Sequence, residues 1–247
     1  MSEPTDPPAA MVPPAPPPAA AGASPGEPPG GHAGNAWERR QELGFVAGLV
    51  RCIRSFVTTP GQAFSETRRS GDLASPLLYA IILAVVTSLV GQLWAMLFGT
   101  SMLAMLPAEF QEALPFWVMS QGAGVMVGFV VMPIVTVIWV FLWGAIMHVL
   151  LLLVGGLESS DAGFEGSLRV VAYSSTGCIA KLVPLIGDMI STLWMIVLAV
   201  IGLTRLHGTS EGKAVTVVLL PLLICCVCVA AAIMVFAGAL LSGMGAE

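Results

Sequence analysis

Long runs of apolar residues, separated by short polar segments, occupy most of the chain after residue 75. The runs cover about residues 76–98, 122–154, 168–185, 189–206 and 214–241. A helix needs about 20 apolar residues to cross the roughly 30 Å hydrocarbon layer of a membrane. Lipid offers no hydrogen bonds to the backbone, so a lipid-exposed crossing of this length is helical. The pattern therefore predicts an all-α integral membrane protein with five transmembrane helices.

The second run is longer than one crossing requires, and it contains Pro133. Proline removes one backbone hydrogen bond and can break a helix, so two shorter helices are the alternative. However, the sequence around the proline, "VVMPIVTV", has no polar turn residues. Neighbouring helices in a membrane tolerate proline, so we expect one long helix that is kinked or tilted.

The first 36 residues have a different composition from the rest of the chain. Residues 1–36 consist mainly of Pro, Ala and Gly. Such a segment cannot bury enough apolar area to offset the entropy of ordering, so we expect a disordered tail. It has neither the basic start nor the apolar centre of a signal peptide, so the first transmembrane helix would insert the protein.

Residues 37–70 link this tail to the first apolar run, and residues 71–244 form the predicted transmembrane domain. In "WERRQELGFVAGLVRCIRSFV" apolar residues recur every three or four positions, while Arg40, Arg51 and Arg54 fall largely outside that stripe. This pattern favours an amphipathic helix lying in the cytoplasmic headgroup region. An amphipathic helix packed against the transmembrane helices is the alternative.

Lysine and arginine are distributed unevenly among the polar segments. The basic residues of the linker and of the loops after the second and fourth runs are Arg39, Arg40, Arg51, Arg54, Arg68, Arg69, Arg169, Arg205 and Lys213. Residues 99–121 contain none. Because short cytoplasmic loops carry the excess of basic residues, the N-terminus is expected in the cytoplasm and the C-terminus outside.

Composition supports this class of protein and excludes others. Hydrophobic residues make up 56% of the 247 residues and charged residues 10%, with a mean hydropathy of +0.88. Soluble domains carry about 25% charged residues, so most of this surface faces lipid. The net charge of −5 argues against nucleic-acid binding, which requires a basic surface. The five cysteines show neither a disulfide framework nor zinc-ligand spacing, and we expect no metal and no cofactor.

The stretch "YSSTGCIAKLVPLIGDMISTLW" places two charged residues near the end of the third run. Pro184 and Gly187 predict a tight reversal between the third and fourth helices. Lys181 would then reach the outer headgroups, and Asp188 would lie at the N-terminus of the fourth helix, where anions are favoured. The pair is expected to mark a helical hairpin, and a ligand or ion site is the alternative.

A few other polar residues lie inside the apolar runs. His148, Ser174, Ser175 and Thr176 are expected to hydrogen-bond between helices or to their own backbone; a transport path lined by them is the alternative. Small-residue pairs at 124 and 128 and at 238 and 242 allow close helix contact and leave homo-oligomerisation open. We found no catalytic motif and expect no enzymatic activity.

Several stretches resemble the Yip1 domain family, in the style of its bacterial members, over about residues 51–223. "DLASPLL" is similar to the family's entry into its first helix, "AYSSTGCIAKLVPLIG" to its third helix and hairpin, and "VIGLTRLHGTSEGKA" to the join of its last two helices. The matching residues are Asp72, Leu73, Pro76, Leu77, Tyr173, Pro184, Gly187, Gly202 and Lys213. Eukaryotic members are Golgi and ER proteins linked to Rab GTPases and vesicle traffic. The resemblance implies a related role for this chain, which is an expectation.

These observations predict a non-enzymatic membrane scaffold or adaptor that acts in membrane organisation or trafficking. Its partners would be the lipid bilayer and a membrane or cytoplasmic protein. The membrane would be the cytoplasmic membrane in a bacterium, or the Golgi or ER in a eukaryote. The alternative is a small transporter or channel that uses the hairpin between the third and fourth helices.

Overall fold

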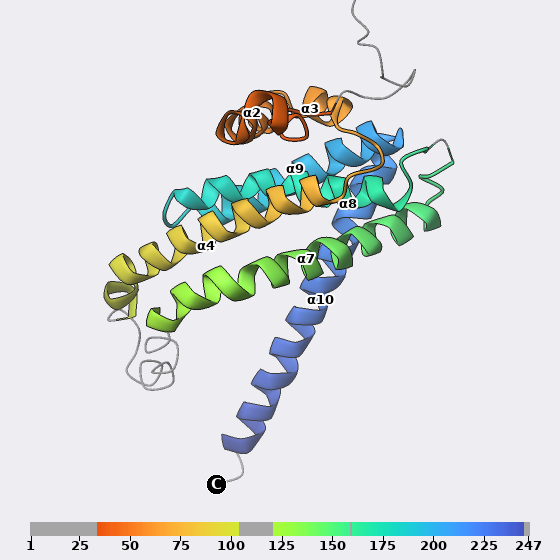
Figure 1. Ribbon diagram of the computed structural model, residues 1–247. Coiled ribbons are helices and arrows are strands. Elements are labelled where there is room, and N and C mark those ends of the chain that lie inside the picture. Colours follow the sequence, from red (N-terminus) through yellow and green to blue (C-terminus); the bar gives the residue numbers. More distant parts are fainter. Residues whose placement is uncertain (1–33, 104–120, 159, 245–247) are drawn as a thin grey trace, which may run out of the picture. The chain divides into compact units, whose positions relative to one another are not determined.

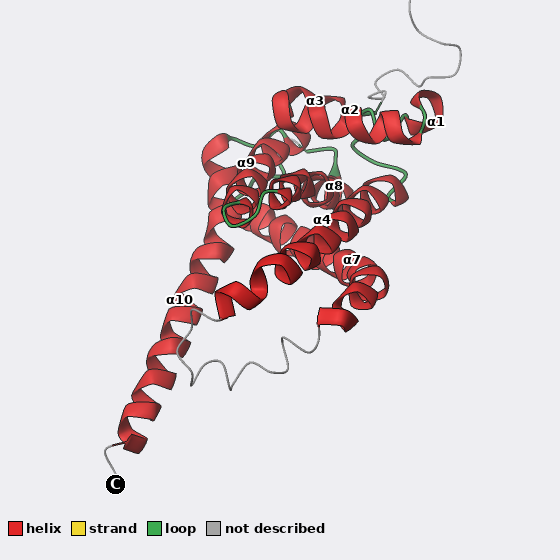
Figure 2. Cartoon of the chain, turned by 90° about the vertical axis from the view of Figure 1, so that its left-hand side faces the viewer, coloured by secondary structure: helices red, strands yellow, loops and turns green. Residues whose placement is uncertain are grey.

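A computed structural model describes residues 34–103, 121–158 and 160–244 (Figure 1). Within these ranges every regular element is a helix (Figure 2). The helices are α1 (Arg40–Leu43), α2 (Phe45–Thr58), α3 (Pro60–Glu66), α4 (Ala74–Leu103), α7 (Gln121–Leu153), α8 (Gly163–Ser174), the 3₁₀-helix η1 (Ser175–Leu182), α9 (Gly187–His207) and α10 (Glu211–Met244). The all-helical class predicted from the sequence is confirmed for this part of the chain.

Four of these helices are long and apolar enough to cross a membrane. The candidate segments are Ala74–Phe98 of α4, Phe129–Leu153 of α7, Gly187–His207 of α9 and Glu211–Val235 of α10. They correspond to the first, second, fourth and fifth apolar runs of the sequence. Large apolar side chains cover much of their exposed surface, as expected for helices that contact lipid.

The second run forms one continuous helix, α7, with Pro133 inside it. No break separates the residues on either side of the proline, so the expectation of a single helix is confirmed. The hydroxyl of Thr136 donates to the carbonyl of Met132 at 2.7 Å, within the same turn.

The third run differs from the single helix expected over residues 168–185. α-Helical geometry begins earlier, at Gly163, and changes to 3₁₀ geometry at Ser175. The side chain of Ser175 donates to the carbonyl of Ala172 at 2.5 Å, and that of Thr176 donates to the carbonyl of Tyr173 at 2.7 Å. Both bonds reach back three residues, the spacing of a 3₁₀ turn, and they favour the tighter winding where it starts.

η1 and α9 form a tight hairpin (Figure 1). The turn between them includes Leu185, which has a φ of 69° and is the only described non-glycine residue with positive φ. α9 then begins at Gly187, whose Cα lies so close to the Ala180 carbonyl that a side chain there would overlap it. The hairpin therefore requires glycine at this position.

The linker expected to form one amphipathic helix contains three helices instead. Gly44, with a φ of 88°, separates α1 from α2. Pro60 stands at the first position of α3, where its missing N–H costs no hydrogen bond. α2 buries Gly48, Cys52 and Phe56, a line of residues four apart. Of the predicted apolar stripe, Val46, Val50 and Val57 are exposed, whereas Leu49 and Ile53 pack against the core.

An aromatic cluster joins these short helices to the long ones. The rings of Phe56 and Tyr173 stack at 5.2 Å, and Phe56 also meets Phe64 edge-on at 4.8 Å. Tyr79 of α4 lies 5.3 Å from Tyr173 and 6.0 Å from Trp37. All five rings are fully buried, so this cluster is the core that holds α2 and α3 against α4 and α8.

α10 packs over its first part only. Ala214, Val217 and Val218 are buried, and the helix contacts α7 and α9. From Leu223 to Val235 every residue is exposed, including three cysteines. This half of α10 is strongly apolar, as a lipid-facing helix must be.

Candidate functional site

A buried ion pair ties the N-terminal helices to the long ones. Nη1 of Arg169, on α8, lies 2.9 Å from Oε1 of Glu38, just before α1. The side chains are 0% and 2% exposed. Burying two opposite charges costs free energy unless nearly all of their polar atoms have hydrogen-bond partners. The partners of Glu38 and Arg169 therefore determine the role of the pair.

The Glu38 carboxylate is fully occupied as an acceptor. The Tyr173 hydroxyl donates to Oε1 at 3.0 Å, beside Arg169. The backbone N–H groups of Asn35 and Arg68 donate to Oε2 at 3.1 and 3.0 Å. With four donors bound and almost no exposure, this carboxylate is a structural anchor and is not placed to take a proton from a substrate.

The Arg169 guanidinium also binds the chain that leads into α4. Its Nη2 donates to the carbonyls of Gly71 and Asp72 at 2.5 and 3.3 Å, and it lies 3.8 Å from a carboxylate oxygen of Glu165. Its Nε has no partner among the described residues. One guanidinium therefore holds the segment before α1 and the start of α4 to α8.

Residues 34–36, assigned to the disordered tail from composition, take part in this junction. Asn35 is 1% exposed, and its Oδ1 accepts from the N–H groups of Trp37 and Glu38 at 3.1 Å each. Its Nδ2 donates to the Thr67 hydroxyl at 3.0 Å. The Trp37 indole donates to the Ser75 carbonyl at 2.7 Å. The structured part of the chain thus begins before residue 37. Residues 1–33 lie outside the described part.

Asp72 caps the N-terminus of α4. Its Oδ1 accepts from the N–H groups of Ala74 and Ser75 at 3.1 and 3.3 Å, and its Oδ2 accepts from the Ser75 hydroxyl. The bond from that hydroxyl lowers the pKa of the Asp72 carboxyl, and the two N–H groups act in the same direction. The family-like motif at this point is therefore a helix cap.

Cys52 lies beside the junction and is fully buried. Burial raises the pKa of its thiol far above the ordinary value, so it stays protonated. A protonated, inaccessible thiol is a packing group and not a nucleophile.

The other residues of the family resemblance lie at close contacts between elements. Leu73 and Leu77 pack against the core, and Pro76 is buried in the first turn of α4. Gly202 faces Val170 and the Phe64 ring so closely that a side chain would clash with both. Nζ of Lys213 donates to the carbonyl of Gly155 at 2.7 Å and so ties the start of α10 to the end of α7.

The residues of the transport alternative do not line one path. His148 Nδ1 bonds the Ser167 hydroxyl at 3.1 Å, and Ser175 bonds its own backbone. Thr176 accepts from the Tyr79 hydroxyl at 2.7 Å. Ser174 lines a cavity between α7 and α9. The hydroxyls of Ser174, Ser175 and Thr176 therefore face different surroundings: a cavity, the backbone and the Tyr79 hydroxyl.

A second cavity of about 370 Å³ lies beside the hairpin. Its polar lining comes from Thr87, Ser88, Lys181 and Asp188, with Trp94 on α4. Lys181 Nζ and Asp188 Oδ1 pair at 3.1 Å, with 41% and 83% of the side chains exposed. The pair thus sits at an open rim and not in a sealed interior.

Sequence reasoning missed a hydrogen-bonded chain through His207. Ser160 bonds its Nδ1 at 2.8 Å and Ser167 bonds its Nε2 at 3.1 Å, and Ser167 also reaches His148. The chain links α7, α8 and α9. No spacing in the sequence marks it, because its members come from four separate segments.

Glu38 was also missed, and Arg169 was treated only as a loop charge. The available signal was the position of Arg169, one residue inside an apolar run, where a cation needs a buried carboxylate. Nothing in the sequence identified Glu38, 131 positions earlier, as that carboxylate.

Some predictions fall outside the described residues. Residues 104–120 are not described, and the side-chain contacts of the small-residue pairs at 124 and 128 and at 238 and 242 are not described either. Among the residues searched, no three His, Cys, Asp or Glu side chains are grouped as a metal site would require.

Comparison with known proteins gives one match. The model of the Yip1 domain family matches residues 53–233, which is more than half of the chain. The chain matches no curated protein and no solved structure. The family match, with several helices apolar enough to cross a membrane, makes this a multi-pass integral membrane protein. The chain belongs to the Yip1 domain family.

Proposed function

We propose that this protein is a non-enzymatic membrane scaffold or adaptor. A scaffold needs a surface held rigidly at the membrane, and the buried Glu38–Arg169 pair is the observation that carries this proposal. It holds α1, α2 and α3 to the membrane domain, so a partner bound there would be coupled to the bilayer. The bilayer is one partner, and a membrane or cytoplasmic protein is the other.

The arrangement of crossings belongs to the same proposal. α8 and η1 have 12 and 8 residues. At about 1.5 and 2.0 Å per residue they extend about 34 Å together, which is enough for the roughly 30 Å of hydrocarbon. Trp94, about 30 Å along α4 from its start, donates to the Leu182 carbonyl at the hairpin. These lengths support a fifth crossing, with the N-terminus in the cytoplasm and the C-terminus outside.

The outer face of α2 suits the cytoplasmic membrane surface. Val46, Val50 and Val57 are 71%, 57% and 46% exposed and follow one side of the helix. Arg51 and Arg54 are exposed beside them. An apolar line flanked by arginines is typical of a helix that lies among lipid headgroups. The tail and the cytoplasmic loops would then face the protein partner.

Affinity capture from native membranes tests the adaptor proposal. Deletion of residues 1–33 keeps Asn35 and the junction, so we expect normal membrane insertion and weaker partner capture. A second variant, Val46→Ser with Val50→Ser, loosens α2 from the headgroups; Gln62→Ser, at an exposed position of α3, is its control. If neither the deletion nor the α2 variant changes the captured proteins, the adaptor proposal is wrong.

The cavity beside the hairpin favours one alternative, a small transporter. Part of its lining is polar, and it has a cation and an anion at its rim. Flux through reconstituted protein would then fall in Lys181→Ala and stay unchanged in His148→Ala, because His148 does not line this cavity. Flux that depends on Lys181 would replace the scaffold proposal.

A further inference from the structure

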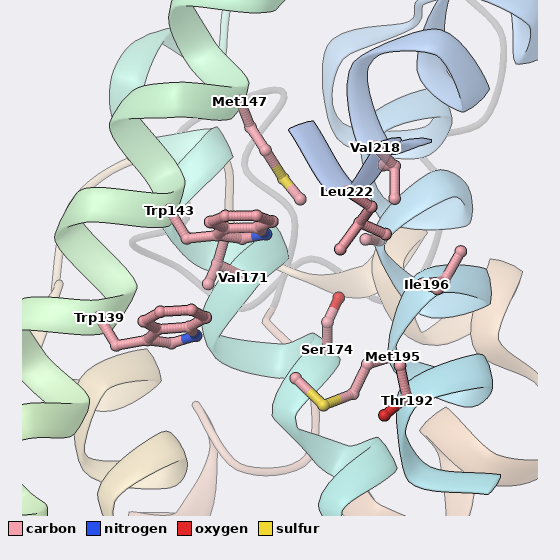
Figure 3. A pocket seen from close by; sticks show the side chains of 11 residues that line it. Trp139, Trp143, Met147, Val171, Ser174, Thr192, Met195, Ile196, Val218 and Leu222 are labelled. Atoms are coloured by element: carbon pink, nitrogen blue, oxygen red, sulfur yellow. The ribbon is translucent and has the colours of Figure 1, made fainter. Parts of the chain in front are cut away.

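The cavity between α7, α8, α9 and α10 has the lining of a ligand site (Figure 3). Its volume is about 230 Å³. An engineered protein cavity of about 150 Å³ binds benzene, so this space admits a substituted six-membered ring. Most of the wall is aliphatic or aromatic, from residues such as Met147, Val171, Ile196 and Leu222.

One polar atom inside the cavity lacks a partner. Ser174 is 3% exposed, and its Oγ makes no hydrogen bond with any described residue. The next two hydroxyls along the chain, on Ser175 and Thr176, both bond backbone carbonyls. Figure 3 shows the Ser174 hydroxyl pointing into the space between α7 and α9. Leaving a buried hydroxyl unpaired costs free energy, so a bound group that pairs with it would be stabilised.

Two further donors face the same space. The indoles of Trp139 and Trp143 stack in parallel, with centroids 5.4 Å apart and 7° between their planes. Figure 3 shows the nitrogen-bearing edges of both rings turned toward the cavity. No described residue accepts from either indole N–H. An indole nitrogen can only donate, so these groups call for an acceptor.

The cavity opens to the outer surface of the helices about halfway along them. Trp139 is 50% exposed at its edge, and Met195 and Ile196 lie near the middle of α9. Around a membrane protein that surface is hydrocarbon, so a ligand would enter from the lipid. Phospholipid esters lie near the headgroups, about 15 Å from the centre of a 30 Å hydrocarbon layer, too far to reach these donors.

We propose that this cavity binds a lipid-soluble quinone, a flat ring with two carbonyl acceptors on an apolar body. The ring fits the volume, and its opposed carbonyl oxygens accept from the Ser174 hydroxyl on one side and an indole N–H on the other. A plain alkyl chain fills the space but leaves all three donors unpaired. A carboxylate has acceptors but would be buried with no cation in the lining.

Photoaffinity labelling of the full chain in phosphatidylcholine nanodiscs tests this assignment. The probe is a benzoquinone with a ten-carbon tail and a diazirine on that tail; the competitor is the same quinone without the diazirine. We expect saturable labelling of α7 and α9 peptides that the competitor abolishes. Ser174→Ala keeps the shape of the wall, and Trp143→Phe keeps an aromatic ring there; each removes one donor and should weaken competition by roughly three- to tenfold.

Two more variants separate lost binding from lost folding. Ser175→Ala removes the adjacent hydroxyl, which does not line the cavity, and should leave labelling unchanged. Ala199→Phe fills the space and should abolish labelling. Labelling that does not saturate, or that ignores both Ser174→Ala and Ala199→Phe, overturns the proposal. So does equal, equally Ser174-dependent labelling by a diazirine-bearing alkane, which would assign the cavity to an acyl chain.

Discussion

Glu38 and Arg169 are 131 positions apart in the sequence, yet their side chains meet at 2.9 Å with almost no exposure. The match to the Yip1 domain begins at residue 53, so Glu38 lies before it and Arg169 inside it. The contact therefore adds a segment outside the matched region to the membrane domain.

Removing one member of this pair should destabilise the protein strongly. Glu38→Gln or Arg169→Met leaves the other charge buried without its partner, and such changes cost about 3–5 kcal/mol. The double variant should recover part of the loss, because no lone charge remains. Chemical unfolding in detergent micelles measures the three free energies. Losses under about 1 kcal/mol in both single variants would show that the pair is not buried as described.

Reactivity of Cys52 provides a direct report on the same junction. With the other four cysteines replaced by alanine, Cys52 should react with maleimide only when α2 separates from the core. Because burial raises the pKa of its thiol, a rise in pH through the ordinary thiol range should not speed the reaction of the folded protein. Val50→Cys in a cysteine-free chain, on the exposed side of α2, is the control and should react fast. In Arg169→Met, we expect Cys52 to react faster.

The cap at α4 predicts a dependence on pH. The pKa of Asp72 is lower in the folded chain than its ordinary value of 3.8, so its charge stabilises the fold fully above that value. The contribution is lost as the pH falls through the lowered pKa. Asp72→Ala should cost about 1 kcal/mol at neutral pH, and Asp72→Asn less, since asparagine is also a good cap. Unfolding curves at neutral and acidic pH check this; an equal loss at both would contradict it.

The hairpin should not tolerate a side chain at its tightest contact. Gly187→Ala places a methyl group against the Ala180 carbonyl, and overpacking of this kind costs about 1–3 kcal/mol. Gly212→Ala is the matched control, because its Cβ would meet nothing within 4 Å. Thermal unfolding of both variants in nanodiscs gives the comparison. Equal stability of the two would mean that the hairpin adjusts at no cost.

Labelling from the two sides of the membrane tests the proposed crossings. In a cysteine-free chain, Leu185→Cys at the hairpin should react with an impermeant maleimide added outside. Glu211→Cys, at the start of α10, should react only after the membrane is opened. Both sites are exposed, so access to reagent is set by the membrane. Loss of the fifth crossing, made by α8 and η1, would exchange the two results, so that Glu211→Cys reacts from outside and Leu185→Cys reacts only in opened membranes.

The sequence allowed good prediction where one physical requirement dominates. Apolar length alone located α4, α7, α9 and α10, because only a helix satisfies its backbone in lipid. The sequence around Pro133 likewise pointed to a single helix. The helix boundaries in the linker were not predicted from the sequence. A proline such as Pro60 can end one helix or start another, and only its packing decides which.

The junction was beyond sequence reasoning for a different reason. A buried charge needs a partner, but the sequence does not say which of many carboxylates supplies it. Composition also placed Asn35 in the tail, since the Gly and Pro around it outweigh one residue. Its bond to Thr67, 32 positions away, forms only once α3 is in place.

The 3₁₀ winding of η1 has a consequence for the cavity at the hairpin. With three residues per turn, every third side chain falls in one line. Cys178 and Lys181 share such a line, and both reach that cavity, whereas Thr176 and Ile179 share another line and face the core. An α-helix of the same residues would rotate Lys181 by about 60° away from Cys178. The 3₁₀ geometry of η1 therefore orients the Lys181 ammonium group toward Asp188.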